Sequence, residues 1–150
     1  MARNAPEAVL LIGIPAAGKT TLYVERFFHS HVRISRDMLR TRAREIKLVR
    51  ACIEARQSFA VDNTNLSREE RAPYIAEARA AGFRITGYFF RPSVRRSIAL
   101  NKKRGAEHNV PVFGILRAFK RIEAPALDEG FDAIYQVDLS EGLRFVVERL

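Results

Sequence analysis

GIPAAGKT, residues Gly13–Thr20, is the stretch of this sequence that decides the fold. It fits the pattern G-x-x-x-x-G-K-[ST], which forms a phosphate-binding loop when a strand precedes it and a helix follows it. Ala8–Ile12 is an unbroken apolar run, typical of a strand buried on both faces, and Lys19–His29 is predicted to be a helix. The segment therefore has the context that the motif requires.

The chemistry of this loop predicts ATP with Mg²⁺ as its ligand. Glycines let backbone N–H groups surround an anion, and the helix that follows adds the partial positive charge of its N-terminus. Lys19 is expected to reach the β- and γ-phosphates, and the Thr20 hydroxyl to bind Mg²⁺. The expected nucleotide-binding residues are Gly13, Ala16, Ala17, Gly18, Lys19, Thr20 and Thr21. The alternative is an ordinary glycine turn with an exposed lysine, which the flanking strand and helix disfavour.

Length and composition indicate one globular domain over residues 1–150. The chain is 47% hydrophobic and 29% charged, with no apolar run of membrane-spanning length and no secretory signal pattern, so we expect a soluble, cytoplasmic protein. Cys52 is the single cysteine, which excludes an internal disulfide, and the three histidines form no zinc-binding pattern with it.

Charge points to polyanionic partners. The net charge is +9 and the pI about 10.4, and 21 of the 26 basic residues are arginine. A positive field concentrates phosphates around a protein, and the guanidinium fork matches phosphate oxygens two at a time. Nucleotides and nucleic acids both fit this charge, although a genomic bias toward arginine codons explains the count equally well.

Strands and helices alternate along the chain, which predicts a three-layer α/β fold with a mainly parallel sheet covered on both faces. Such a sheet places its ligands at the carboxyl ends of its strands. The expected strands are Ala8–Ile12, Val32–Ser35, Ser58–Val61, Arg84–Phe90 and Ala133–Val137. The expected helices are Lys19–His29, Asp37–Arg56, one from Ser67 to Gly82, Ser93–Lys103, Phe113–Arg121 and Glu141–Leu150.

Two acidic positions stand where strands are expected to end. Asp37 follows the second strand and lies three residues before Arg40, so the pair fits either a proton acceptor with a phosphate contact or a helix cap with a solvated charge. Asp62 closes the third strand, where a carboxylate can hold magnesium. The cluster Asp62 to Asn65 also fits a simple turn before the Ser67 helix.

A basic segment follows the fourth strand and suggests a helical lid over residues of about 92–121. Arg104 precedes Gly105, and in this place it could neutralise charge on a transferring phosphoryl group. The alternative is a solvated helix face, the common reading of a charge run. The cations in question are Arg91, Arg95, Arg96, Lys102, Lys103 and Arg104.

In combination, these segments resemble the kinase domain of the polynucleotide 5′-kinases found in end-healing enzymes. The matching motifs follow the family's order over nearly the whole chain. They are Gly13–Thr20, Ser35-Arg36-Asp37 with Arg40, Val61–Asn65, Asn101–Gly105 followed by Val110-Pro111-Val112, and Phe119–Phe131. Only the phosphate loop is common among P-loop proteins, so the specificity of the resemblance comes from the combination.

The resemblance implies transfer of the γ-phosphate of ATP to a 5′-hydroxyl of DNA or RNA. It implies a general base at Asp37 and a transition-state arginine at Arg104, with Lys19 completing the catalytic set. It also implies substrate contacts by Asp37, Arg40 and Asn65, and Mg²⁺ binding by Thr20 and Asp62. Leu100 departs from the phage-type lid, which has a basic residue four positions before the lid arginine.

Two other functions would use the same ATP-binding residues. One is a small-molecule kinase acting on a sugar, nucleoside or antibiotic, and the other is a nucleotide-regulated nucleic-acid-binding module without catalysis. The sequence contains no D-x-D-G-[ST] phosphatase signature. We therefore expect 3′-phosphate removal or strand sealing to come from a separate phosphatase or ligase protein.

Overall fold

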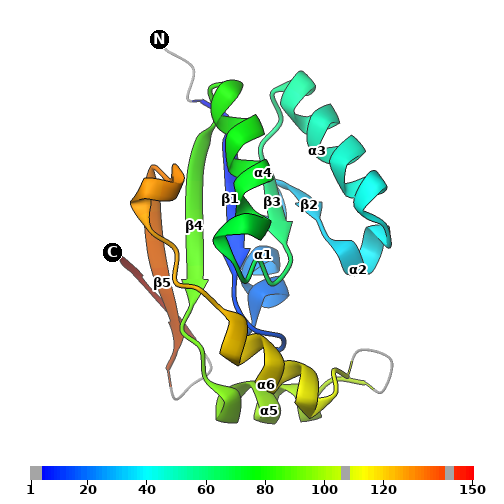
Figure 1. The fold of residues 1–150 in the computed structure, drawn as a ribbon, viewed down its shortest axis with the longest axis vertical. Coiled ribbons are helices and arrows are strands. Elements are labelled where there is room, and N and C mark those ends of the chain that lie inside the picture. Colours follow the sequence, from blue (N-terminus) through cyan, green and yellow to red (C-terminus); the bar gives the residue numbers. More distant parts are fainter. Residues whose placement is uncertain (1–4, 106–108, 141–143) are drawn as a thin grey trace.

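A six-stranded sheet lies at the centre of the computed structural model, which describes residues 5–105, 109–140 and 144–150 (Figure 1). Its strand order is β2-β3-β1-β4-β5-β6, and all neighbouring strands are parallel except β5 and β6. The strands are β1 Glu7–Ile12, β2 Val32–Ile34, β3 Phe59–Asp62, β4 Arg84–Phe90, β5 Ala133–Leu139 and β6 Phe145–Arg149. The prediction of a mainly parallel α/β sheet is confirmed.

Alternate side chains of β1 face the two sides of the sheet and enter two separate cores, because side chains of a strand point to opposite faces in turn. Ala8, Leu10 and Ile12 belong to the core under α3 (Arg42–Ala55) and α4 (Arg68–Ala80). Val9 and Leu11 belong to the core under α1 (Lys19–Arg26). Helices therefore cover both faces, as expected of a three-layer fold (Figure 1).

The predicted lid is a pair of helices, α5 (Val94–Lys102) and α6 (Val112–Arg121), which lies beyond the carboxyl end of β4 (Figure 1). Ile115 and Ala118 of α6 pack with Ile14 of the phosphate loop and Leu66 in a third apolar cluster. This packing places the lid against the carboxyl ends of the strands, the edge where such sheets bind ligands.

The single helix predicted over Asp37–Arg56 is wrong, because the chain breaks there into α2 (Arg36–Leu39) and α3. Arg40 has φ of 75°, outside the right-handed helical region, and ends α2. Thr41 then starts α3 by accepting a hydrogen bond from the Arg44 N–H at 3.2 Å. The break turns α3 away from α2 and brings Arg36 of α2 and Arg42 of α3 to one cavity.

The helix predicted at the carboxyl end is also wrong. Phe145–Arg149 forms β6, antiparallel to β5, while residues 141–143 of that prediction lie outside the described residues. Phe145 and Val147 pack on the core under α1, and Val146 between them is exposed. This period of two, with aromatic and β-branched residues, suits a strand.

The remaining helices and strands were placed correctly, with ends that differ by a few residues. α1 ends at Arg26 instead of His29, and a 3₁₀ turn over Leu127–Glu129 was not predicted. Within the described parts of the chain, every helix is too short or too polar to cross a membrane.

Candidate active site

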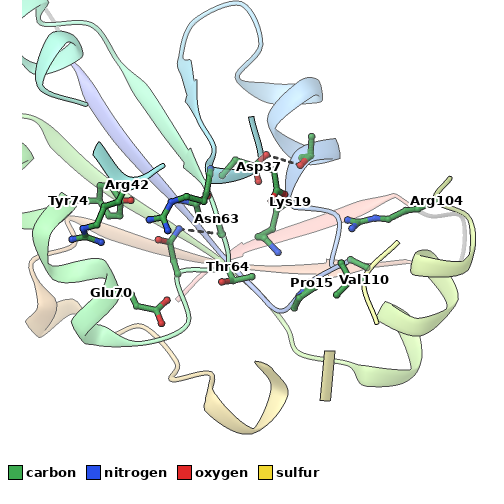
Figure 2. Close-up of a pocket in the computed structure, with 15 residues that line it drawn as sticks. Pro15, Lys19, Asp37, Arg42, Asn63, Thr64, Glu70, Tyr74, Arg104 and Val110 are labelled. Atoms are coloured by element: carbon green, nitrogen blue, oxygen red, sulfur yellow. Dashed lines mark hydrogen bonds between the residues drawn. The ribbon is translucent and has the colours of Figure 1, made fainter. Parts of the chain in front are cut away.

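A cavity of about 490 Å³ opens at the carboxyl ends of the strands, between the phosphate loop, α2, α4 and the lid (Figure 2). Four of the residues that the sequence analysis selected for chemistry contribute to it from separate segments: Lys19, Asp37, Asp62 and Arg104. The other lining residues are Pro15, Ala16, Thr20, Arg36, Arg42, Asn63, Thr64, Asn65, Glu70, Tyr74 and Val110.

The phosphate loop joins β1 to α1 through two left-handed residues. Ala16 has φ of 60° and Gly18 has φ of 97°, so the chain reverses there and the following N–H groups turn toward a common centre. The Gly13 N–H donates to the Thr64 carbonyl at 3.0 Å, which fastens the loop to the end of β3. Ala17 faces a shallower hollow on the other side of the loop, and Thr21 is exposed on α1.

Backbone carbonyl groups of the phosphate loop hold the Lys19 side chain in place. Its Nζ donates to the carbonyls of Gly13 at 3.0 Å and Ile14 at 2.8 Å. Burial, together with the positive charge of Arg104, lowers the pKa of Lys19 to about 8, while Asp62 and Asp37 oppose the change. These three charged groups therefore all act on the ammonium group, although they come from the lid, β3 and α2.

Thr20 and Asp62 form a donor set that fits Mg²⁺. The Thr20 hydroxyl donates to Asp62 Oδ2 at 2.7 Å, and Asp62 is only 6% exposed. Mg²⁺ is bound in kinases through one or two protein oxygens, with phosphate oxygens and water as the other ligands. Among the described residues no group of three or more His, Cys, Asp or Glu could hold a metal, so Thr20 and Asp62 would need phosphate oxygens and water to complete the coordination of Mg²⁺.

Arg33 also reaches this carboxylate, which the sequence analysis did not foresee. Its Nε donates to Asp62 Oδ2 at 2.8 Å, and its guanidinium lies 3.4 Å from the Thr20 hydroxyl. Arg33 projects from β2, next to β3 in the sheet. The cation neutralises Asp62 in the absence of a metal, because a nearly buried carboxylate needs a partner.

Asp37 stands in the first turn of α2, exposed at the cavity and within electrostatic reach of Lys19. The helix cap lies elsewhere: Ser35 is the N-cap residue, and the Arg36 N–H donates to Asn63 Oδ1 at 2.9 Å. Of the two interpretations of Asp37, the geometry therefore disfavours the helix cap. Its carboxylate is left facing the space above the phosphate loop (Figure 2).

The acceptor half of the cavity is formed around Glu45, a buried residue that the sequence analysis missed. Glu45 is 1% exposed and accepts hydrogen bonds from the Arg36 guanidinium, from the Asn63 amide at 3.4 Å and from the Tyr74 hydroxyl at 2.7 Å. Burial and the bond to Glu45 raise the pKa of Tyr74, so this hydroxyl remains a donor. One carboxylate thus orients side chains from α2, β3 and α4.

Two expected substrate contacts are placed differently. Arg40 is exposed at the break between α2 and α3, outside the set of residues that line the cavity, and Arg36 and Arg42 occupy that wall. Asn65 does line the cavity, but its side chain is 3% exposed and its amide donates to the Leu11 carbonyl at 2.7 Å. These contacts favour a structural role for the Asn65 amide.

Arg104 reaches the cavity from just beyond α5, and Figure 2 shows its guanidinium directed toward Lys19. Asn101, which is 4% exposed, anchors this end of the lid. Its amide donates to the Val110 carbonyl at 2.6 Å and its oxygen accepts from the Val110 N–H at 2.9 Å. Asn101 therefore brings the segment of Arg104 close to Val110, which lines the same cavity.

Comparison with known proteins agrees with this geometry. The AAA domain family matches residues 39–126, more than half of the chain. The chain belongs to this family. A bifunctional polynucleotide phosphatase/kinase of Schizosaccharomyces pombe is 27% identical over 135 residues, which is 87% of the chain and 33% of the relative. The AAA domain described here thus spans about one third of that relative, and the predicted resemblance to polynucleotide kinases is confirmed.

Solved structures show the same fold at lower identity. A gluconokinase from Sinorhizobium meliloti superposes with a TM-score of 0.66 at 18% identity, over 94% of the AAA domain chain and 87% of its own. Kti12 of Chaetomium thermophilum, solved in complex with ADP-AlF3, superposes with a TM-score of 0.64 at 17% identity, over 91% of the AAA domain chain and 92% of its own. With the phosphate loop and its lysine in place, this AAA domain is a P-loop kinase domain.

Proposed function

We propose that this domain transfers the γ-phosphate of ATP to the 5′-hydroxyl end of DNA or RNA. The observation that carries the proposal is the position of Asp37, which faces the phosphate-loop lysine across the cavity, on the side where Arg36 and Arg42 form a cationic wall. A 5′-hydroxyl strand offers both groups that such a wall would recognise, a hydroxyl for Asp37 and a neighbouring phosphate for an arginine.

The proposed chemistry divides the residues between the two substrates. Lys19 and Arg104 stabilise negative charge on the transferring phosphoryl group from two sides, and Asp37 accepts the proton of the attacking hydroxyl. Thr20 and Asp62 would hold Mg²⁺, which neutralises phosphate charge when it is bound. Arg33 would then share the Asp62 carboxylate with the bound cation.

The nucleotide base belongs on the other side of the phosphate loop in this proposal. The shallow hollow beside Ala17 has apolar residues such as Phe90 and Leu139 in its lining, together with two cations, Arg91 and Arg96. Its volume is only about 10 Å³, so a purine would lie on its rim, where the arginines could make cation–π contact with the base. The acceptor half of the cavity then stays free for the strand that receives the phosphate.

Similarity and charge support the nucleic-acid acceptor over a small one. The Schizosaccharomyces pombe relative is a polynucleotide phosphatase/kinase, and the net charge of +9 suits a polyanion better than an uncharged sugar. A cytoplasmic location and a separate phosphatase or ligase partner remain part of the proposal. The gluconokinase fold makes a small-molecule acceptor the alternative to test.

An acceptor panel with γ-labelled ATP tests the proposal. We expect DNA or RNA oligonucleotides with a 5′-hydroxyl to take up label, and gluconate and free nucleosides to take up at least a hundredfold less at equal concentration. Labelling of a sugar or nucleoside with no labelled oligonucleotide would establish the small-molecule alternative. Oligonucleotide binding without transfer to any acceptor would indicate a binding module.

A further inference from the structure

A second hollow opens between α3 and α4, directly beside the acceptor half of the active-site cavity. It has a volume of about 230 Å³ and is lined by Arg42, Ile46, Val49, Arg50, Pro73, Tyr74 and Glu77. Arg42 and Tyr74 also line the active-site cavity, and they lie next to each other in Figure 2. The two spaces therefore adjoin each other at these two side chains, and we call the second one the α3–α4 groove.

The walls of the α3–α4 groove combine an apolar surface with a cationic rim. Ile46, Val49 and Pro73 supply aliphatic surface, and the Tyr74 ring is fixed by its hydroxyl bond to Glu45 at 2.7 Å. Arg42 stands at the junction with the main cavity, and Arg50 lies about 12 Å further along α3 at 1.5 Å per residue. An aromatic and aliphatic floor between two cations is the arrangement that holds a base and its flanking phosphates.

The ion pair across the groove does not close it to a ligand. Arg50 Nη2 lies 3.4 Å from Glu77 Oε1, with 68% of the Arg50 side chain and 40% of the Glu77 side chain exposed. Exposed pairs of this kind contribute little free energy, so Arg50 is able to exchange Glu77 for a phosphate. Lys47 and Arg44 are exposed on the same helix and add to the positive field.

We infer that the α3–α4 groove binds the nucleobase of the second nucleotide of the acceptor strand, with Arg42 and Arg50 at the phosphates on either side of it. This inference rests on the proposed function, because it continues the path of a strand whose 5′-hydroxyl lies at Asp37. The small volume suits one base, since pockets for larger ligands measure roughly 300–1,000 Å³.

The acceptors that test this inference differ only in the second nucleotide. They are a nucleoside 3′-phosphate, a dinucleotide 3′-phosphate, and the same dinucleotide 3′-phosphate without its second base, each with a 5′-hydroxyl and saturating ATP. Stacking of one base contributes about 1–3 kcal/mol, which corresponds to a gain of roughly 5- to 150-fold. We expect kcat/KM of the intact dinucleotide to exceed that of both other acceptors by about tenfold.

Groove variants show whether the gain arises in the α3–α4 groove. Arg50→Glu and Ile46→Glu should abolish the gain from the second nucleotide, with kcat/KM for the nucleoside 3′-phosphate within about threefold of wild type. Lys47→Glu makes the same charge change as Arg50→Glu on the same helix outside the groove, so it should keep the gain. Activity on the nucleoside 3′-phosphate also shows that each variant is folded.

Each outcome bears on one of the two proposals. If the abasic dinucleotide equals the intact one, or if Lys47→Glu and Arg50→Glu act alike, the groove is not a base subsite and the proposed function still stands. The same conclusion follows if Arg50→Glu lowers kcat/KM for the one-nucleotide and two-nucleotide acceptors equally. If no 5′-hydroxyl acceptor is labelled while a sugar or nucleoside is, the proposed function fails and the inference with it.

Discussion

At the scale of single residues, the side chains that we assign to phosphate binding were predictable because they belong to a local motif. Lys19 and Thr20 have fixed places in the phosphate loop, and Asp62 closes the strand beside it. The acceptor wall was not predictable in the same way. Arg36 and Glu45 are nine residues apart, and they meet only because the chain turns at Arg40.

Asp37→Asn tests the proton acceptor at the residue scale. The amide keeps the size of the carboxylate but cannot take up the proton, so we expect kcat to fall by about 10²–10⁴ and the Kd of ATP to change less than threefold. Steady-state kinetics with a 5′-hydroxyl oligonucleotide and a separate ATP titration measure the two effects. Asp128→Asn, an exposed aspartate far along the chain, serves as the control. Full activity of Asp37→Asn would remove the assigned role.

The lowered pKa of Lys19 predicts how ATP affinity depends on pH. The protonated ammonium binds the phosphates, so affinity should be constant below about pH 8 and fall as the pH rises through this value, by at most tenfold per pH unit. Calorimetric titration of ATP between pH 6.5 and 9.5 measures this pH dependence, and both limits lie roughly one to two pH units from the pKa. Lys19→Met should bind weakly with no such dependence, while Lys47→Met should retain it. A flat wild-type profile would contradict the assignment.

At the scale of elements, the errors arose where tertiary contacts override a local pattern. Arg40 interrupts an otherwise helical stretch, and no glycine or proline marks the break. The final segment pairs with β5 as β6, antiparallel and starting from the pair Leu139 and Phe145. The aromatic and β-branched run Phe145, Val146 and Val147 was the hint available in the sequence.

The lid makes an element-scale prediction through Asn101. Asn101→Ala removes the bonds that join the end of α5 to Val110, so Arg104 loses its fixed approach to the phosphates. We expect kcat to fall about tenfold, against roughly 10²–10³ for Arg104→Ala, which removes the charge itself. Asn109→Ala is the matched control, because it leaves both bonds between Asn101 and Val110. Wild-type kcat in Asn101→Ala would show that the lid positions Arg104 by other means.

At the scale of the whole molecule, one buried arginine links the sheet-covering helix α4 to the segments that follow the lid. Arg71 is 0% exposed and pairs with both oxygens of Glu129, at 2.8 and 3.0 Å. Its remaining nitrogen donates to the carbonyls of Asn65 and Glu123 at 2.9 and 3.0 Å. Sequence periodicity does not predict this role. An arginine is rarely fully buried unless it is paired, and periodicity does not identify the partners.

Loss of this arginine should destabilise the fold without touching the chemistry. Arg71→Ala removes the cation that pairs with the buried Glu129 carboxylate and the donor to the carbonyls of Asn65 and Glu123, so we expect the free energy of unfolding to drop by about 3–5 kcal/mol. Urea unfolding measures the change. Arg68→Ala removes a partner of Asp128 from an exposed ion pair on the same helix and should leave the urea midpoint unchanged. Equal midpoints for the two variants would contradict the structural role of Arg71.

The central claim concerns the atom that receives the phosphate, and matched oligonucleotides test it most directly. Two strands of one sequence, one with a 5′-hydroxyl and one with a 5′-phosphate, are incubated with γ-labelled ATP and wild-type protein. The account predicts one labelled phosphate per 5′-hydroxyl strand, at its 5′ oxygen, and none on the phosphorylated strand. Equal labelling of both strands, or label on neither while a small molecule is phosphorylated, would contradict it.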